Sequence, residues 1–189
     1  DWSMLWWPEW SQGNGWQMLG VPRADGRVVD LPNGHGFDES AFQHVYLGSA
    51  AVFTEQLMLG PAEVIDGFAC YGIGLVAISI ATARRAVDRA REYSLNRRQG
   101  GALIGEHDAV AELLANSENS IATAEAMLDR AVALEPGIDR LHLVWRMRAE
   151  VQPLLSRAGS DALQVFGGIG YMRDVGPERD QRDLNSLRR

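Results

Sequence analysis

The chain has 189 residues, of which 46% are hydrophobic, so it can bury a core in one domain or slightly more. Its formal net charge of −7 and the absence of a long basic block exclude a nucleic-acid surface. Its single cysteine, Cys70, cannot form an internal disulfide, so a reducing compartment and a cytoplasmic location are expected. The longest apolar run, residues 68–80, is too short for a membrane span, and none is expected.

The first sixty residues alternate short apolar runs with Asn-Gly and Asp-Gly pairs, which is typical of strands and hairpins. Strands are predicted at 16–21, 27–31 and 45–52, and β structure is expected only in residues 1–60. Five of the six tryptophans lie within the first sixteen residues. This tryptophan-rich segment either packs a β core or forms an aromatic wall beside a flat ligand, and a partner surface is expected to cover it.

From residue 61 onward the apolar residues recur with helical spacing. Long helices are predicted at about 62–96, with a break near Tyr71 and Gly72, at 106–134 and at 138–166. Pro153 is expected to kink or split the third of these, and a last helix is predicted to begin near Pro177. The fold class is therefore mainly α: an antiparallel four-helix bundle preceded by a short β segment.

The third predicted helix runs into a glycine cluster, Gln164-Val165-Phe166-Gly167-Gly168-Ile169-Gly170-Tyr171. Taken alone, this cluster is a helix stop followed by a loop. Its bare backbone also permits close approach of a flat or phosphorylated ligand. An acidic and basic segment, Arg179-Asp180-Gln181-Arg182-Asp183, follows.

Four segments, which follow one another along the chain as they do in the family, resemble the acyl-CoA dehydrogenase superfamily. The run 45–60 resembles its last middle-domain strands, and 81–97 resembles the first bundle helix, which ends in Tyr-x-x-x-Arg. The other two are Glu106-His107-Asp108, at the entry to the second helix, and the glycine cluster with its Arg-Asp segment. The resemblance implies that residues 1–60 are the C-terminal part of the middle β-domain and that 61–189 are the C-terminal helical bundle.

The resemblance also implies an FAD site that is shared between subunits. A guanidinium suits a pyrophosphate, and a glycine turn lets the adenylate side of the cofactor lie against backbone. No metal site is predicted. The expected cofactor-binding residues are Arg97, Arg98, Gln99, His107, Asp108, Gln164, Gly167 and Gly168.

No catalytic residue is assigned. Fatty acyl-CoA dehydrogenases usually carry a catalytic glutamate after the Arg-Asp motif, and counting onward places that position shortly beyond Arg189. Other members place the base on the first bundle helix, where the corresponding region here is near Tyr71, with Gly72 in the place of an expected Arg. Neither position identifies a base in this sequence.

The function implied by the resemblance is an FAD-dependent oxidoreductase that performs α,β-dehydrogenation of an acyl thioester, an acyl-CoA. This chain would supply the C-terminal half of a subunit in a homo-oligomer or hetero-oligomer. Two other functions stay open: a flavin-dependent monooxygenase or tailoring enzyme on the same fold, and a non-catalytic subunit that lends flavin contacts to a partner. A flavin absorbance band, and whether an acyl-CoA bleaches it, distinguishes these functions.

Overall fold

The structure is a computed structural model, and it describes residues 4–11, 15–22, 26–30, 43–47 and 55–188. By its internal contacts the chain divides into two compact units. One contains the strand region up to Phe68, and the other contains the chain from Ala69 onward. The division predicted between residues 60 and 61 stays a prediction.

The strand unit contains two antiparallel sheets. One has the order β1-β2-β5, from Met4–Ser11, Gly15–Pro22 and Glu55–Met58, and the other pairs β3 (Gly26–Asp30) with β4 (Gln43–Leu47). The strand predicted at 16–21 is confirmed, and so is the part of the strand predicted at 27–31 that covers residues 27–30; residue 31 lies outside the described residues. Of the strand predicted at 45–52 the structure shows residues 45–47, and 48–54 lie outside the described residues.

Within the tryptophan-rich segment, residues 4–11 form strand β1, which the sequence analysis did not predict as a strand. β1 is an edge strand of its sheet and pairs Trp10 with Trp16 and Pro8 with Met18. An edge position tolerates Pro8 because a proline has no N–H to donate to a second neighbour. Whether a partner surface covers this segment stays a prediction.

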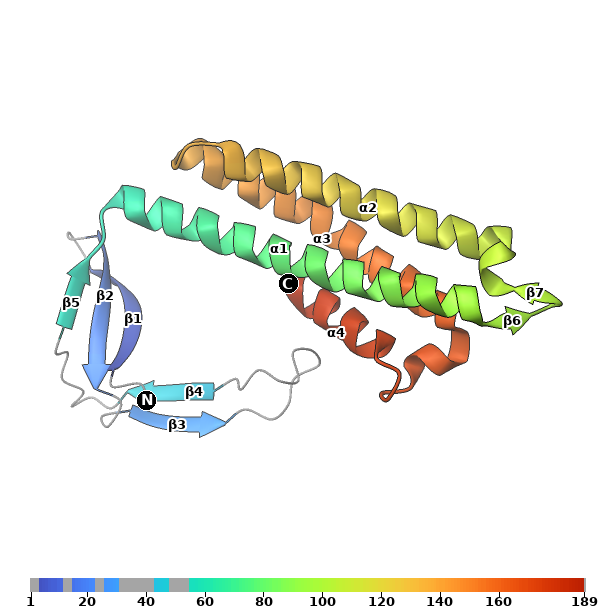
Figure 1. Ribbon diagram of the computed structural model, residues 1–189. Coiled ribbons are helices and arrows are strands. Elements are labelled where there is room, and N and C mark those ends of the chain that lie inside the picture. The colour runs from blue at the N-terminus through green and yellow to red at the C-terminus, as the bar shows by residue number, and fades with distance from the viewer. Residues whose placement is uncertain (1–3, 12–14, 23–25, 31–42, 48–54, 189) are drawn as a thin grey trace. The chain divides into compact units, whose positions relative to one another are not determined.

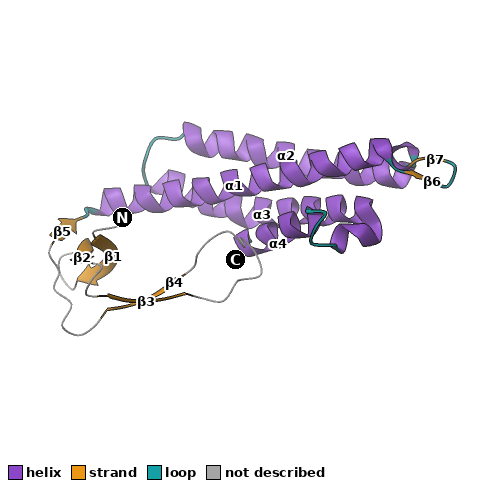
Figure 2. Ribbon diagram, turned by 60° about the horizontal axis from the view of Figure 1, so that its bottom comes forward, coloured by secondary structure: helices purple, strands orange, loops and turns teal. Residues whose placement is uncertain are grey.

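Four helices make up most of the described chain: α1 (Pro61–Asn96), α2 (Asp108–Ala133), α3 (Ile138–Phe166) and α4 (Pro177–Leu187). α1, α2 and α3 run side by side, and the shorter α4 packs on α3 (Figures 1 and 2). All four contribute to one apolar core, which includes Val76, Ile121, Met147, Leu155 and Leu184. The mainly helical architecture is therefore confirmed.

The predicted break in α1 near Tyr71 and Gly72 is wrong, since the helix is continuous. Gly72 is buried, and a Cβ atom added to it would lie 2.4 Å from Cγ1 of Val144 on α3. The glycine therefore allows α1 and α3 to pack closely, which is worth more than its low helix propensity costs. No larger side chain fits at this position unless the Val144 side chain or α3 shifts.

Of the kink or split predicted at Pro153, the split is wrong, because α3 runs unbroken from Ile138 to Phe166. Proline removes the N–H that would bond to the carbonyl of Ala149. Both Pro153 and Ala149 are exposed, so water can hydrate that carbonyl. On the buried side, Gln152 donates from Nε2 to Oγ of Ser79 on α1 at 2.9 Å, which holds the helix in place there.

β structure is not confined to the first sixty residues, contrary to the prediction. A small hairpin of β6 (Arg98–Gln99) and β7 (Ala102–Leu103) connects α1 to α2. Its two turn residues, Gly100 and Gly101, have φ of 65° and 89°. Positive φ at both positions is what the tightest hairpin turns require, so this glycine pair forms a turn, and α1 ends earlier, at Asn96.

Ion pairs tie α1 to both α2 and α4. The Asp180 carboxylate on α4 is buried, and Arg85 donates to its Oδ1 from Nε at 2.9 Å and from Nη2 at 2.6 Å. Arg89 donates from Nη1 to Oδ2 at 3.0 Å. On the other side of α1, Arg84 bonds Glu125 of α2 at 2.6 Å, and this hydrogen bond raises the pKa of the Arg84 guanidinium.

Asp180→Asn is expected to lower the free energy of unfolding by about 1.5–3 kcal/mol, because charge-assisted hydrogen bonds to a buried carboxylate are lost. Asp174→Asn, in an exposed loop, is the matched control and should change stability little. Urea denaturation followed by circular dichroism measures both. Equal effects of the two substitutions would contradict the role of Asp180.

Among the described residues, α1 alone is long and apolar enough to cross a membrane. Its most apolar 18-residue window has a mean hydropathy of 1.9, and 28% of that window is buried. Core helices of soluble proteins meet the same criteria. The absence of a membrane span therefore stays a prediction.

Candidate functional site

An open cleft of about 620 Å³ lies at the end of the helical unit that carries the β6–β7 hairpin. Its walls come from the end of α1, the hairpin, the start of α2, the end of α3 and the 3-10 turn Gly167–Tyr171. Segments more than sixty residues apart in the sequence thus form one site. The lining residues are Tyr93, Arg97, Gln99, Gly100, Ile104, His107, Val110, Gln164, Val165, Phe166, Gly167, Gly168 and Ile169.

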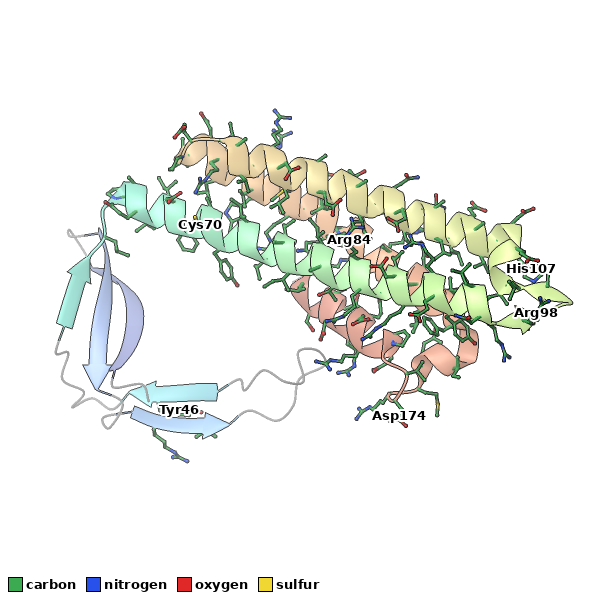
Figure 3. The ribbon with its side chains drawn as sticks, viewed as in Figure 1. Tyr46, Cys70, Arg84, Arg98, His107 and Asp174 are labelled. Carbon is green, nitrogen blue, oxygen red and sulfur yellow. The ribbon has the colours of Figure 1, made fainter. Side chains whose placement is uncertain are left out.

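Most of the predicted site residues lie in this cleft. The lining includes Arg97, Gln99, His107, Gln164, Gly167 and Gly168. Arg98 and Asp108 do not line it: Arg98 is exposed on β6, and Asp108 is the exposed first residue of α2. Arg98 and His107 both lie at the end of the helical unit that carries the hairpin (Figure 3).

The glycine turn presents bare backbone to the cleft. Gly167 follows the last residue of α3 with φ of 62° and ψ of −145°, a conformation that strains any residue with a side chain. A Cβ atom added to Gly167 or Gly168 would meet no atom within 4 Å. At Gly170 an added Cβ would lie 2.8 Å from Cβ of Phe166, so this third glycine is required for packing. Gly167 and Gly168 therefore leave their backbone open to a ligand, whereas Gly170 allows close packing against Phe166.

Two aromatic residues of the lining were not among the predicted site residues. The rings of Tyr93 on α1 and Phe166 on α3 stack with centroids 4.5 Å apart and planes 22° apart. Tyr93 is the tyrosine of Tyr-x-x-x-Arg, and the four-residue spacing places it on the same helix face as Arg97. That spacing was a usable signal for Tyr93. Phe166 has no comparable signal in the sequence.

Arg97 stands at the junction of α1 and the hairpin. Its N–H donates to the Tyr93 carbonyl at 3.0 Å, and its carbonyl accepts from the Ile104 N–H at 2.8 Å. Within the described part of the chain its guanidinium has no hydrogen bond or ion pair. A permanently charged group with free donors at the edge of a cleft is suited to an anionic ligand.

His107 connects the hairpin to α2. Its ring nitrogen Nε2 lies 3.0 Å from the carbonyl oxygen of Gln99 on β6. Its own carbonyl accepts from the N–H groups of Val110 and Ala111, at 2.9 and 3.1 Å, in the first turn of α2. Through these hydrogen bonds, His107 connects the hairpin to the first turn of α2, and both elements form part of the cleft.

The lining residues determine what the cleft can do chemically. They include one unpaired cation, exposed backbone, and a stacked aromatic pair, but no carboxylate. Such a site can bind and orient a ligand that has both a flat and an anionic part, and it supplies no carboxylate base. Within the described residues, no group of three or more His, Cys, Asp or Glu side chains is arranged to hold a metal ion.

Comparison with known proteins finds curated relatives of this chain. The chain is 33% identical over 112 residues to cyclohexane-1-carbonyl-CoA dehydrogenase of Geobacter metallireducens, covering 59% of this chain and 29% of the relative. It is 26% identical over 124 residues to 3-sulfinopropanoyl-CoA desulfinase of Paraburkholderia xenovorans, covering 66% and 32%. The chain therefore spans about a third of the length of these relatives.

Solved structures share the fold. A putative acyl-CoA dehydrogenase from Mycobacterium smegmatis superimposes with a TM-score of 0.86 at 21% identity, covering 98% of this chain and 51% of that one. A nitroalkane oxidase in complex with spermine gives a TM-score of 0.80 at 21% identity, covering 94% and 46%.

The family match is the most specific of these findings. The family model described as "Acyl-CoA dehydrogenase, C-terminal domain" matches residues 64–188, which include all four helices but for the first residues of α1, together with the hairpin and the whole cleft. The chain belongs to the acyl-CoA dehydrogenase family, through its C-terminal domain.

Proposed function

We propose that this chain is the C-terminal half of a subunit of an FAD-dependent oxidoreductase that dehydrogenates an acyl thioester, and that its cleft binds part of the FAD. The observation that carries the proposal is the convergence of Arg97, Gln164 and the Gly167–Gly168 backbone on one cleft. Arg97 lies more than sixty positions before the other three residues in the sequence, and all four were predicted as cofactor contacts from the resemblance alone.

The cleft fits such a cofactor. The free guanidinium of Arg97 is suited to donate to pyrophosphate oxygens, and the open backbone at Gly167 and Gly168 leaves room for an adenylate group. Its volume of about 620 Å³ lies in the usual range of ligand sites. When bound, FAD supplies the acceptor for a hydride from the substrate. The residues of this chain bind the cofactor, orient it and balance its charge.

The FAD site is proposed to be shared with another subunit. The cleft is partly open to solvent, and its lining contains no carboxylate that would remove a proton from a thioester substrate. Such a cleft can serve the proposed reaction when a second chain supplies the rest of the flavin and substrate site. We therefore propose a homo-oligomer or hetero-oligomer in which this cleft faces a neighbouring chain's flavin.

A second candidate function is supported by the packing at Gly72. Because Val144 closes against this glycine, α1 has no room there for the charged residue expected at that position. This favours a subunit that lends flavin contacts to a partner, or a flavin enzyme with other chemistry such as a monooxygenase. Proteins named as a desulfinase and a nitroalkane oxidase are among those similar to this chain.

The test is spectroscopic. The purified assembly that contains this chain is expected to show a flavin absorbance band, and an acyl-CoA is expected to bleach it without added reductant. A flavin band that no acyl-CoA bleaches supports the second candidate function. An assembly that binds no flavin when FAD is added rules out both.

Gly168→Val is expected to weaken FAD binding through bulk. A Cβ atom added at Gly168 would meet no atom within 4 Å, so the fold should tolerate a valine there, but its side chain would occupy the backbone face of the cleft. The loss of affinity should not depend on ionic strength, because no charge is removed. Flavin titration at low and high salt measures it, with Gly168→Ala as the smaller control, and unchanged affinity for the valine variant would contradict this use of the turn.

A further inference from the structure

We infer that His107 is a positioning residue rather than a direct cofactor ligand: its side chain fastens the β6–β7 hairpin and so sets where Gln99 and Arg97 face the cleft. This inference rests on the proposed function and concerns the same site. It revises the expectation that His107 itself binds the cofactor.

The hydrogen bond fixes the form of the imidazole. The atom that faces Nε2 of His107 is the carbonyl oxygen of Gln99, which can only accept. The ring therefore carries its proton on Nε2 and donates it, and the distance of 3.0 Å is normal for such a bond. A Cβ atom added to Gly100 would lie 3.6 Å from Cε1 of this ring, so the ring also lies against the hairpin turn.

The hairpin needs such a fastening because it is very short. Each strand has two residues, and a hairpin of this size is marginal in water without further support. Its base is already held, since Ile104 donates to the Arg97 carbonyl and Gly105 packs against Ser94, where an added Cβ would lie 3.1 Å from Oγ. Toward the tip, among the described residues, the side-chain hydrogen bond that holds the hairpin is the one from His107 to the Gln99 carbonyl.

The position of the hairpin affects the cleft because hairpin residues form part of the cleft lining. Gln99 and Gly100 line the cleft next to Arg97, which is the last residue before the hairpin. If the tip opens, both lining residues move, and the junction that aims Arg97 loosens with them. His107 thus acts on the ligand through other residues, by restricting where they lie before the ligand binds.

The proposal is tested with three substitutions that differ in where they place a donor. Glutamine places its amide nitrogen at the same number of bonds from Cα as Nε2 of histidine, and asparagine places it one bond closer. Leucine keeps bulk and offers no donor. His107→Gln should therefore retain the bond to the Gln99 carbonyl, whereas His107→Asn and His107→Leu should lose it.

Two readouts are taken on the assembly that contains this chain: amide hydrogen exchange of the hairpin before FAD is added, and the dissociation constant for FAD. The Asn and Leu variants are expected to raise hairpin exchange roughly 3- to 10-fold and to weaken FAD binding by a similar factor, the size expected for one neutral hydrogen bond. The Gln variant should restore both values.

Several results would overturn the inference. If His107→Leu weakens FAD binding with no change in hairpin exchange, the ring contacts the cofactor directly. If exchange rises but affinity does not change, the bond is structural only, and failure of the Gln variant to rescue shows that the donor is not what matters. If the unsubstituted assembly binds no FAD, the proposed function fails, and the exchange data alone then decide whether His107 fastens the hairpin.

Discussion

Replacing Arg97 by alanine is expected to weaken FAD binding by about ten- to a hundredfold. Its guanidinium has no partner within the described part of the chain, and it faces the cleft beside the open glycine turn. A charge-assisted hydrogen bond to a pyrophosphate contributes about 1.5–3 kcal/mol, and each 1.4 kcal/mol corresponds to a factor of ten. Because the loss is electrostatic, it should shrink as salt concentration rises. Flavin titration of the assembly at two ionic strengths measures it.

The neighbouring residue provides a matched control. Arg98→Ala removes the same charge one residue further along, from an exposed position that does not line the cleft. It should change FAD affinity much less than Arg97→Ala. Equal losses in the two variants would mean that only the local positive charge matters, and an unaffected Arg97→Ala assembly would remove Arg97 from the site.

Leu155→Ala is expected to lower the free energy of unfolding by about 2–5 kcal/mol, the usual cost of emptying a leucine site in a core. Leu155 is fully buried, whereas its neighbour Leu154 is 37% exposed. Leu154→Ala should therefore cost much less. Chemical denaturation of both variants compares the two positions directly.

This pair of variants also tests the continuity of α3. Both leucines follow Pro153, and only an unbroken helix keeps Leu155 on the same buried face as Met147 and Val151. Similar losses of unfolding free energy in Leu154→Ala and Leu155→Ala would contradict the placement of Leu155 on the buried face of α3. A stabilising effect at either position would contradict the core as described.

The sequence predicted the helices well and their interruptions poorly. Apolar residues at helical spacing placed the first three helices to within a few residues, because burial of one face dominates their stability, and Pro177 marked the start of the fourth. Gly72 was interpreted as a break, and Pro153 as a kink or split, from local preference alone. In the fold the glycine serves close packing of α1 on α3, and the proline lies on an exposed face, so tertiary contacts outweigh both preferences.

The hairpin between α1 and α2 was not predicted, and the reason is a different one. Its strands have two residues each, too short for an alternating pattern, and Gly100-Gly101 equally fits a helix stop. The sequence singled out Arg97 through Tyr-x-x-x-Arg and added Arg98 as its neighbour, and the geometry at the end of α1 shows that Arg97 lines the cleft and Arg98 does not. Phe166 was missed because its role depends on stacking with Tyr93, seventy-three positions earlier.

The central claim is that this cleft holds part of an FAD bound by a neighbouring chain. The most direct measurement is an electron cryomicroscopy or crystal structure of the FAD-loaded assembly. We expect the pyrophosphate of the cofactor within hydrogen-bond distance of the Arg97 guanidinium, its adenylate side against the Gly167–Gly168 backbone, and its flavin ring in the adjoining chain. FAD bound elsewhere in the assembly, with this cleft filled by solvent or protein, would contradict the account.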